Sequence, residues 1–262
     1  MPSFFASPRF PCKSSMTRVA VSVGIFLLFM LNNIAALAQI NIEPTRIVLE
    51  HDNRTAIITL SNSSLLPQIV TPVWTDLVQA ADGVLHPSGK EIAPFDYTPI
   101  KIWPTTAILK AGKAISFSVL LDPEREISGE TRIHLRFNVD PQFGNGPRWA
   151  AVIPVFVRDG SSKTDVQILG VSAQGNERLL VTLKKLGQTS PHGYLVVFDQ
   201  YGRRLATLNN VNLFSQNKPV TLSVAMDTWP KGAMKVRYIG DAEFTGILFA
   251  EHAFQISPDQ SQ

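Results

Sequence analysis

The chain has 262 residues, with 24 basic and 21 acidic side chains and a formal net charge of +3. Three of the basic residues and none of the acidic ones lie in residues 1–38, so the rest of the chain carries 21 charges of each sign. This balance gives no electrostatic indication of nucleic-acid binding, and the only cysteine, Cys12, lies in the same leading segment, which excludes a disulfide or a cysteine-based metal site in the rest of the chain.

Residues 1–38 have the pattern of a secretory signal peptide. Arg9, Lys13 and Arg18 form a basic leader, an apolar run occupies residues 19–30, and a small-x-small cleavage pattern ends at Ala38. The apolar run is shorter than the ~20 residues that a membrane-spanning helix needs. We expect cleavage after Ala38 and export without membrane insertion; the alternative is an uncleaved anchor.

Residues 39–158 are predicted to form short strands separated by turns. Residues 114–121 and 132–139 alternate between apolar and polar side chains, which predicts antiparallel strands with one face in a core and one in water. Arg132, His134 and Arg136 lie on the polar face of the second of these strands. About seven such strands fit an immunoglobulin-like β-sandwich.

Residues 159–163 read DGSSK and are predicted to be a linker, which is followed by a second domain in residues 164–257 and a frayed tail at 258–262. The candidate strands of the second domain are residues 166–171, 179–186, 194–198, 204–208, 219–226, 233–238 and 247–254. The predicted fold is therefore all-β, with two immunoglobulin-like sandwiches.

The sequence contains no recognisable catalytic, cofactor-binding or metal-binding motif. The five histidines, at positions 51, 86, 134, 192 and 252, lack ligand spacing and are expected to be surface or hydrogen-bonded residues. A G-x-S-x-G elbow and a glycine-rich phosphate loop are both missing. Asp122, Glu124, Glu126 and Glu130 are interpreted as a solvated loop between strands. A binding protein without catalytic activity, cofactor or metal is favoured over an enzyme.

Residues 149–157 are apolar on both alternating faces, yet they include Pro154. A strand of this kind fits the centre of a sandwich with Pro154 at a bulge. It also fits a sheet edge that pairs with another protein, since main-chain hydrogen bonds can add a strand to a partner's sheet. An apolar edge is an aggregation hazard unless something covers it.

Several segments together resemble the periplasmic chaperones of chaperone–usher pilus assembly, in particular the divergent branch called archaic. The resemblance covers nearly all of the chain after the signal, and it depends on the order and spacing of these segments. They are EPTRIVL at 43–49, TLSNSS at 59–64, IWP at 102–104, LKAGK at 109–113, GETRIHL at 129–135, IPVFVR at 153–158 and KGAMKVRY at 231–238.

The resemblance implies a boomerang of two immunoglobulin-like domains that works in the periplasm. The last strand of the first domain would be lent to a pilin subunit that lacks its own last strand, until an outer-membrane usher takes the subunit. The apolar strand also makes a self-capped homodimer plausible. The alternative is a structural or adhesive two-sandwich protein of the cell surface.

The resemblance also implies site residues. Arg46 matches the first-strand arginine that holds the pilin's terminal carboxylate; the alternative is an interdomain or surface salt bridge. The lysine that completes this anchor in the best-known members is replaced by Pro154, and Arg132 or Arg136 is the expected substitute. Arg158 matches an arginine that bridges the two domains.

One of the two possible orientations of the lent strand is expected. Trp149, Ala151 and Ile153 are expected to face the pilin, with Val155 next on the same face, while Val152 and Phe156 face the chaperone's own core. The alternative for Trp149 is a place in that core, since most tryptophans are mainly buried. A slip of one residue would exchange the two faces.

Overall fold

The computed structural model describes residues 40–89, 99–144, 148–175, 177–230 and 232–255. The predicted signal peptide and the tail at 258–262 lie outside these ranges. Within them the chain is built from β-strands with a single 3-10 turn, η2 (Ala242–Phe244). No helix in these ranges has the length and apolar character needed to cross a bilayer.

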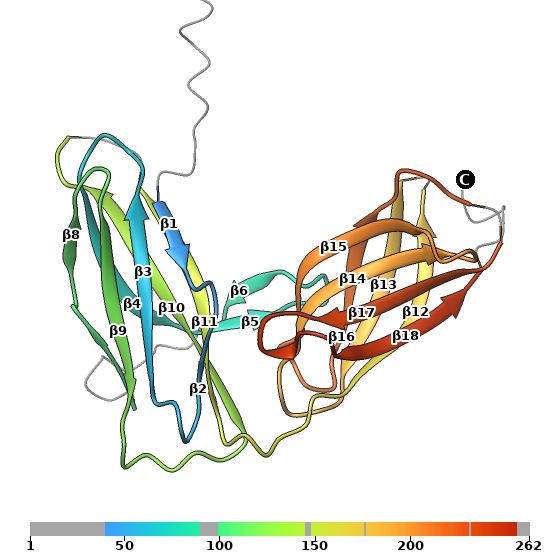
Figure 1. Cartoon of the computed structure of the whole chain (residues 1–262), viewed down its shortest axis with the longest axis horizontal. Helices are drawn as coiled ribbons and strands as arrows, with labels where there is room; N and C mark the ends of the chain where they lie inside the picture. Colours follow the sequence, from blue (N-terminus) through green and yellow to red (C-terminus); the bar gives the residue numbers. More distant parts are fainter. Residues whose placement is uncertain (1–39, 90–98, 145–147, 176, 231, 256–262) are drawn as a thin grey trace, which may run out of the picture. The chain divides into compact units, whose positions relative to one another are not determined.

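The first sandwich consists of two sheets that face each other (Figure 1), with strand orders β1-β3-β9-β7 and β2-β11-β10-β4-β8. The strands of the first sheet are β1 (Ile40–Glu43), β3 (Thr55–Asn62), β9 (Ala114–Leu121) and β7 (Ile100–Trp103). Those of the second are β2 (Ile47–Leu49), β11 (Trp149–Arg158), β10 (Glu130–Pro141), β4 (Gln68–Thr75) and β8 (Ala107–Leu109).

Alternating apolar residues from both sheets fill the space between them. Leu135, Phe137 and Val139 of β10 are fully buried, as are Phe117 and Val119 of β9. The rings of Phe117 and Phe137 meet edge to face at 5.3 Å, and each large apolar side chain contributes roughly 1.5–3 kcal/mol by leaving water. The prediction that these two strands have one core face is confirmed.

The second sandwich has sheets of order β12-β13-β16 and β15-β14-β17-β18. Its strands are β12 (Val166–Gln174), β13 (Arg178–Lys185), β16 (Pro219–Ala225), β15 (Arg204–Asn212), β14 (His192–Asp199), β17 (Met234–Gly240) and β18 (Leu248–Phe254). It encloses a separate core that includes Leu179, Val181, Val197 and Val236. All seven strands expected here are present, with ends that differ by a few residues, so the all-β prediction with two sandwiches is confirmed.

A hairpin formed by β5 (Leu77–Gln79) and β6 (Leu85–Pro87) was not predicted. It continues from β4 and extends away from the first sandwich (Figure 1). Each of its strands has only three residues, which is too short for an apolar periodicity to be recognised. The described part of the chain up to Arg158 therefore contains eleven strands, where about seven were expected.

Candidate functional site

One half of strand β11 is paired on both edges, and the other half is paired on one edge only. It pairs with β10 over its whole length, whereas its other edge pairs with β2 only at residues 155–157. In the ranges that the structure describes, no strand lies beside residues 149–154 on that edge. The strand is therefore central in one half and at an edge in the other, and Pro154 lies where the two halves meet. The bulge expected at Pro154 is absent from the ladder with β10, which continues through this residue in unbroken register.

The expected orientation of β11 is wrong for its two core residues. Val152 is 39% exposed, and Phe156 packs on Phe214 of the second sandwich, whereas Ile153 is 4% exposed within the core of the first sandwich. The cause is the register with β10, which places Ile153 opposite the core residue Leu135. A strand that is apolar on both faces carries no local signal for this choice.

The other residues on the core-facing side of β11 differ in how deeply they are buried. Val155 is fully buried, whereas Trp149 is only partly buried and packs against the same core, and Ala151 is also only partly buried. The side chains that a client was expected to cover therefore face the protein's own core. Only Trp149 and Ala151 among them are partly accessible.

Arg46, which lies between β1 and β2, connects the two sandwiches. Its Nε donates to Glu243 at 2.9 Å, one terminal nitrogen donates to Asn212 Oδ1 at 3.1 Å, and the other donates to the Ser190 carbonyl at 2.9 Å. Its guanidinium also lies 3.9 Å from the centre of the Phe156 ring, within cation–π range. Burial lowers the pKa of Arg46, and the nearby Glu243 opposes that shift.

Arg158, the last residue of β11, lies in a buried cluster of charges. It donates to Glu130 at 2.7 Å, to Glu243 at 3.2 Å and to the Ser190 carbonyl at 3.2 Å. Glu130 accepts two further bonds from Ser190, and Lys185 Nζ lies 3.8 Å away. Burial lowers the pKa of Lys185 to about 8. Each charge in the cluster has an opposite partner, as buried charges require.

The solvated-loop interpretation is wrong for Glu130. Its side chain is only 4% exposed, while Asp122, Glu124 and Glu126 are exposed as expected. The difference arises because Glu130 begins β10 and is paired in register with Arg158 at the end of β11. No feature of the acidic run itself distinguishes this residue.

No sequence pattern pointed to the partners of Arg46, which are Glu243, Ser190 and Asn212. They contact Arg46 across 197, 144 and 166 residues of chain, so no local pattern links them to it. Glu243 is presented by η2, whose first N–H is capped by the Asp241 carboxylate at 2.8 Å. Because it accepts from both Arg46 and Arg158, one carboxylate holds two arginines together.

A hollow of about 490 Å³ opens beside Arg46. Val152 and Pro154 line it from β11, and His192, Asn212 and Phe214 are among the residues that line it from the second sandwich. The exposed face of the free half of β11 therefore shares one cavity with the Arg46 side chain. Pro154, which stands where a lysine was expected, borders this same cavity.

The two arginines considered as substitutes for that lysine lie differently. Arg132 donates to the Leu77 carbonyl at 3.0 Å and packs 4.4 Å from the Phe214 ring centre, and burial lowers its pKa. Arg136 is exposed opposite Val152, and no ion pair holds it within the described ranges. Arg136 thus lies across the paired edge of β11 from Val152.

His134 is buried beside this site, with 1% of its surface exposed. Its Nδ1 accepts from the Leu77 N–H at 3.3 Å, and its ring meets Phe214 edge to face at 6.1 Å. Burial, and secondarily the charge of Arg132, lower the pKa of His134 to about 4.

We expect His134 to make the protein less stable in acid. The unfolded chain binds a proton with a pKa near 6.5 and the folded chain only near 4, so stability falls as the pH falls through this window. The loss amounts to as much as about 3 kcal/mol. In urea denaturation between pH 4 and 7, His134→Leu should remove this part of the pH dependence. The exposed control His86→Leu should keep it, and equal pH slopes for the two variants would contradict the assignment.

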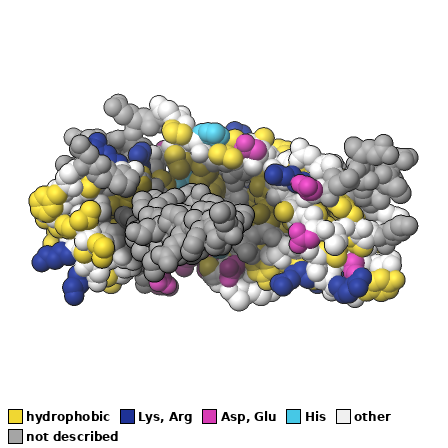
Figure 2. All heavy atoms as spheres, turned by 90° about the horizontal axis from the view of Figure 1, so that it is seen from above, with side chains coloured by type: hydrophobic (Ala, Val, Ile, Leu, Met, Phe, Trp, Pro, Cys, Tyr) yellow, Lys and Arg dark blue, Asp and Glu magenta, His cyan; other side chains and the backbone are white. Residues whose placement is uncertain are grey.

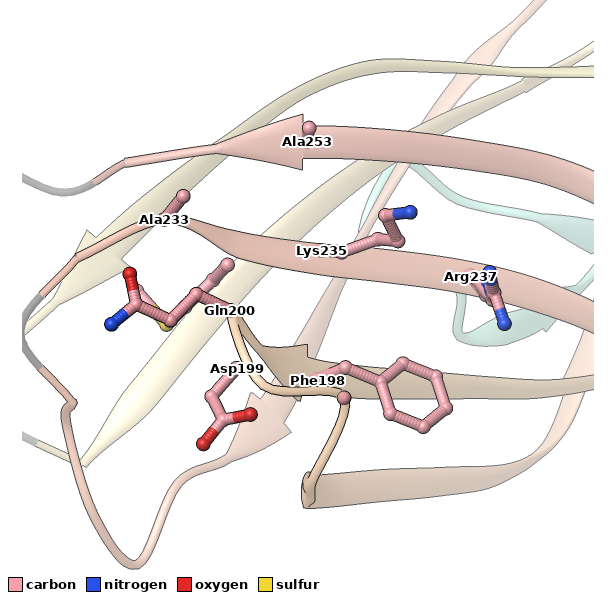
Figure 3. A pocket seen from close by; sticks show the side chains of 9 residues that line it. Phe198, Asp199, Gln200, Ala233, Lys235, Arg237 and Ala253 are labelled. Atoms are coloured by element: carbon pink, nitrogen blue, oxygen red, sulfur yellow. The ribbon is translucent and has the colours of Figure 1, made fainter.

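A second hollow, of about 290 Å³, lies on the second sandwich between the ends of β14 and β17 (Figure 3). Its two cations, Lys235 and Arg237, both form ion pairs with Glu251 of β18. Arg237 also lies 5.4 Å from the Phe198 ring centre. Both cations are already held by one carboxylate within the sheet, which gives this hollow a weaker claim to a charged ligand than the one beside Arg46.

The visible surface of the second sandwich carries charges of both signs, interspersed rather than gathered into one field (Figure 2). The described part of this face therefore shows no single-sign field of the kind that steers a strongly charged partner.

No protein-family model matches the chain, and no curated protein matches its sequence. Solved structures do match its fold. The YadV chaperone superposes with a TM-score of 0.50 at 12% identity, over 83% of this chain and 100% of that one. The CupB2 chaperone of Pseudomonas aeruginosa superposes with a TM-score of 0.50 at 13% identity, over the same shares. The chain therefore has the fold of these chaperones, with two immunoglobulin-like sandwiches.

Proposed function

We propose that this chain, which shares the fold of the YadV and CupB2 chaperones, is a periplasmic chaperone that binds pilin subunits by strand donation. It would hold each subunit until an outer-membrane usher takes it for pilus assembly. The chemistry is binding alone, without a bond-breaking step. The observation that carries the proposal is the unpaired apolar edge of β11 at residues 149–154.

An apolar edge of this kind is a poor surface for a protein without a partner. Natural sheets protect their edges with charged residues, bulges or covering segments, yet residues 149–154 contain no charge. A client that lacks one strand would complete its own sheet on this edge through main-chain hydrogen bonds. Val152, which is exposed on the hollow side, and the accessible Trp149 and Ala151 would then be covered by the client.

The client's terminal carboxylate is proposed to enter the hollow beside Arg46. Arg46 now donates to the neutral side-chain oxygen of Asn212, and a carboxylate would replace that oxygen because charge-assisted hydrogen bonds are stronger. Arg136, which is free and adjacent to Val152, is the proposed second cation. Arg132 is a weaker candidate, since its guanidinium is occupied by Leu77 and Phe214.

The function is tested by coexpression with a small exported pilin subunit. A soluble one-to-one complex is expected. Stable incorporation of this chain into surface fibres would instead support the structural or adhesive alternative.

Arg46→Gln is expected to weaken the pilin complex severely, by about a hundredfold or more, since a buried ion pair would lose one partner. Arg136→Gln is expected to weaken it by roughly tenfold, because this arginine is exposed. Titration of the purified variants with a pilin measures both effects. Arg148, whose side chain is exposed and 3.2 Å from Asp140, offers the control Arg148→Gln. Unchanged affinity for Arg46→Gln would remove Arg46 from the site.

A further inference from the structure

The side chain of Gln79, at the end of β5, joins the hairpin to the second sandwich. Its Nε2 donates to the Asn212 carbonyl at 2.8 Å, and its Oε1 accepts from the Phe214 N–H at 2.9 Å. In a parallel sheet, one residue pairs with two groups of the neighbouring strand: the carbonyl of one residue and the N–H of the residue two positions later. Asn212 and Phe214 offer this same pair of groups to Gln79. Gln79, which is only 9% exposed, therefore makes with its side-chain amide the two hydrogen bonds that a neighbouring strand would make.

The rest of the hairpin tip also contacts the second sandwich. The Thr221 N–H donates to the Ala81 carbonyl at 2.7 Å. Gly83 has a φ of +85°, and a Cβ at this position would come within 2.6 Å of the Leu222 side chain. For a larger residue, either the Leu222 side chain or the tip would have to shift, and the positive φ would be strained.

The base of the hairpin is held on the first sandwich. Leu77 at the start of β5 donates its N–H to His134 and accepts from Arg132 through its carbonyl, and both of these residues belong to β10. The hairpin is thus attached to β10 at one end and to residues 212–221 at the other. It forms a connection between the sandwiches that is independent of the linker at 159–163.

The residues that Gln79 holds are the ones that orient the hollow beside Arg46. The side-chain oxygen of Asn212 binds Arg46 at 3.1 Å and His192 at 3.0 Å. The Phe214 ring packs against Phe156, the residue over which Arg46 lies. A shift of the segment 212–214 would therefore displace the partners of Arg46.

We propose that Gln79 is a positioning residue, which fixes Asn212 and Phe214 through the β5–β6 hairpin and so holds Arg46 in place before a client arrives. The hairpin also sets the separation of the two sandwiches in the free protein. The effect on the client rests on the proposed function, whereas the effect on the separation does not.

The test replaces Gln79 by methionine, which has similar volume but makes neither hydrogen bond. Gln167→Met, at an exposed position of β12, is the matched control. Because Cys12 is the only cysteine and lies within residues 1–38, the chain starting at Gln39 accepts two added cysteines for spin labels. Lys113→Cys and Glu177→Cys, both exposed, place one label on each sandwich.

We expect Gln79→Met to broaden the distance distribution between the labels, to about twice its width or more, and to weaken pilin binding about tenfold, since two buried backbone groups lose their partners. Gln79→Glu, which can accept from Phe214 but cannot donate to Asn212, should give a smaller change in the same direction. Thermal melts and far-UV circular dichroism check that each variant is folded.

An unchanged distance distribution in Gln79→Met would overturn the proposal, and so would a broadened distribution with unchanged pilin affinity. If Gln79→Met does not fold, Gln79→Glu decides by the same two measurements. Failure of the unchanged chain to bind any pilin would refute the proposed function, while the label distances would still test the hairpin.

Discussion

Val152→Arg is expected to weaken binding of a pilin client severely while leaving the free protein folded. Val152 is 39% exposed on the face of β11 that borders the hollow beside Arg46, so an arginine there extends into solvent in the free chain. A client strand on the edge at residues 149–154 would bury this position, and an unpaired buried charge should weaken the complex by at least about 3 kcal/mol, or about a hundredfold. Titration of the variant with a purified pilin measures the effect.

The matched control is Leu120→Arg, on β9 in the opposite sheet, where the side chain is 47% exposed. Both variants should melt close to the unchanged chain, because neither places the charge in a core. Normal pilin affinity in Val152→Arg would contradict the proposed use of this face. Equal losses in both variants would indicate a general effect of surface charge.

Glu130→Ala is expected to cause the largest loss of stability among single substitutions at the contact between the sandwiches. Its carboxylate is the shared partner of Arg158 and Ser190 and lies 3.8 Å from Lys185. Removing it leaves Lys185 without this carboxylate and Arg158 with Glu243 alone. Breaking a buried pair from one side costs about 3–5 kcal/mol. The free energy of unfolding in urea measures the loss.

Glu126→Ala provides the control, since Glu126 is exposed in the same acidic segment and should change stability by less than about 0.5 kcal/mol. Glu130→Gln should lie between the two, because an amide keeps the ability to accept hydrogen bonds but not the charge. A loss of under about 1 kcal/mol in Glu130→Ala would mean that the cations reach other partners or water.

The strands whose side chains alternate clearly were predictable, and so was the free edge at Pro154. Residues 114–121 and 132–139 show a period of two, which is a local property, and both form strands with the expected core face. Pro154 within an apolar strand indicated an edge, and the structure has a free edge ending at that residue. The hairpin β5–β6 was not predictable from periodicity because its strands are too short.

The contacts of the candidate site were predictable only in part. The resemblance singled out Arg46 and Arg158, and both lie at the contact between the sandwiches. Their partners Glu243, Ser190 and Asn212 come from turns and strand ends that carry no local pattern. Gln79 belongs to the same group, since its role depends on two peptide groups 133 and 135 residues away.

By itself, the sequence determined that this protein is all-β, that it has two sandwiches, and that one strand of the first is apolar on both faces. These are consequences of side-chain order along the chain, and they hold whatever the strands pair with. Only the tertiary structure decided that Ile153 and not Val152 faces the core, and that Glu130 is buried against Arg158. The physical reason is register, because the pairing of β10 with β11 assigns every side chain to a face and to a neighbour, and local sequence does not contain that pairing.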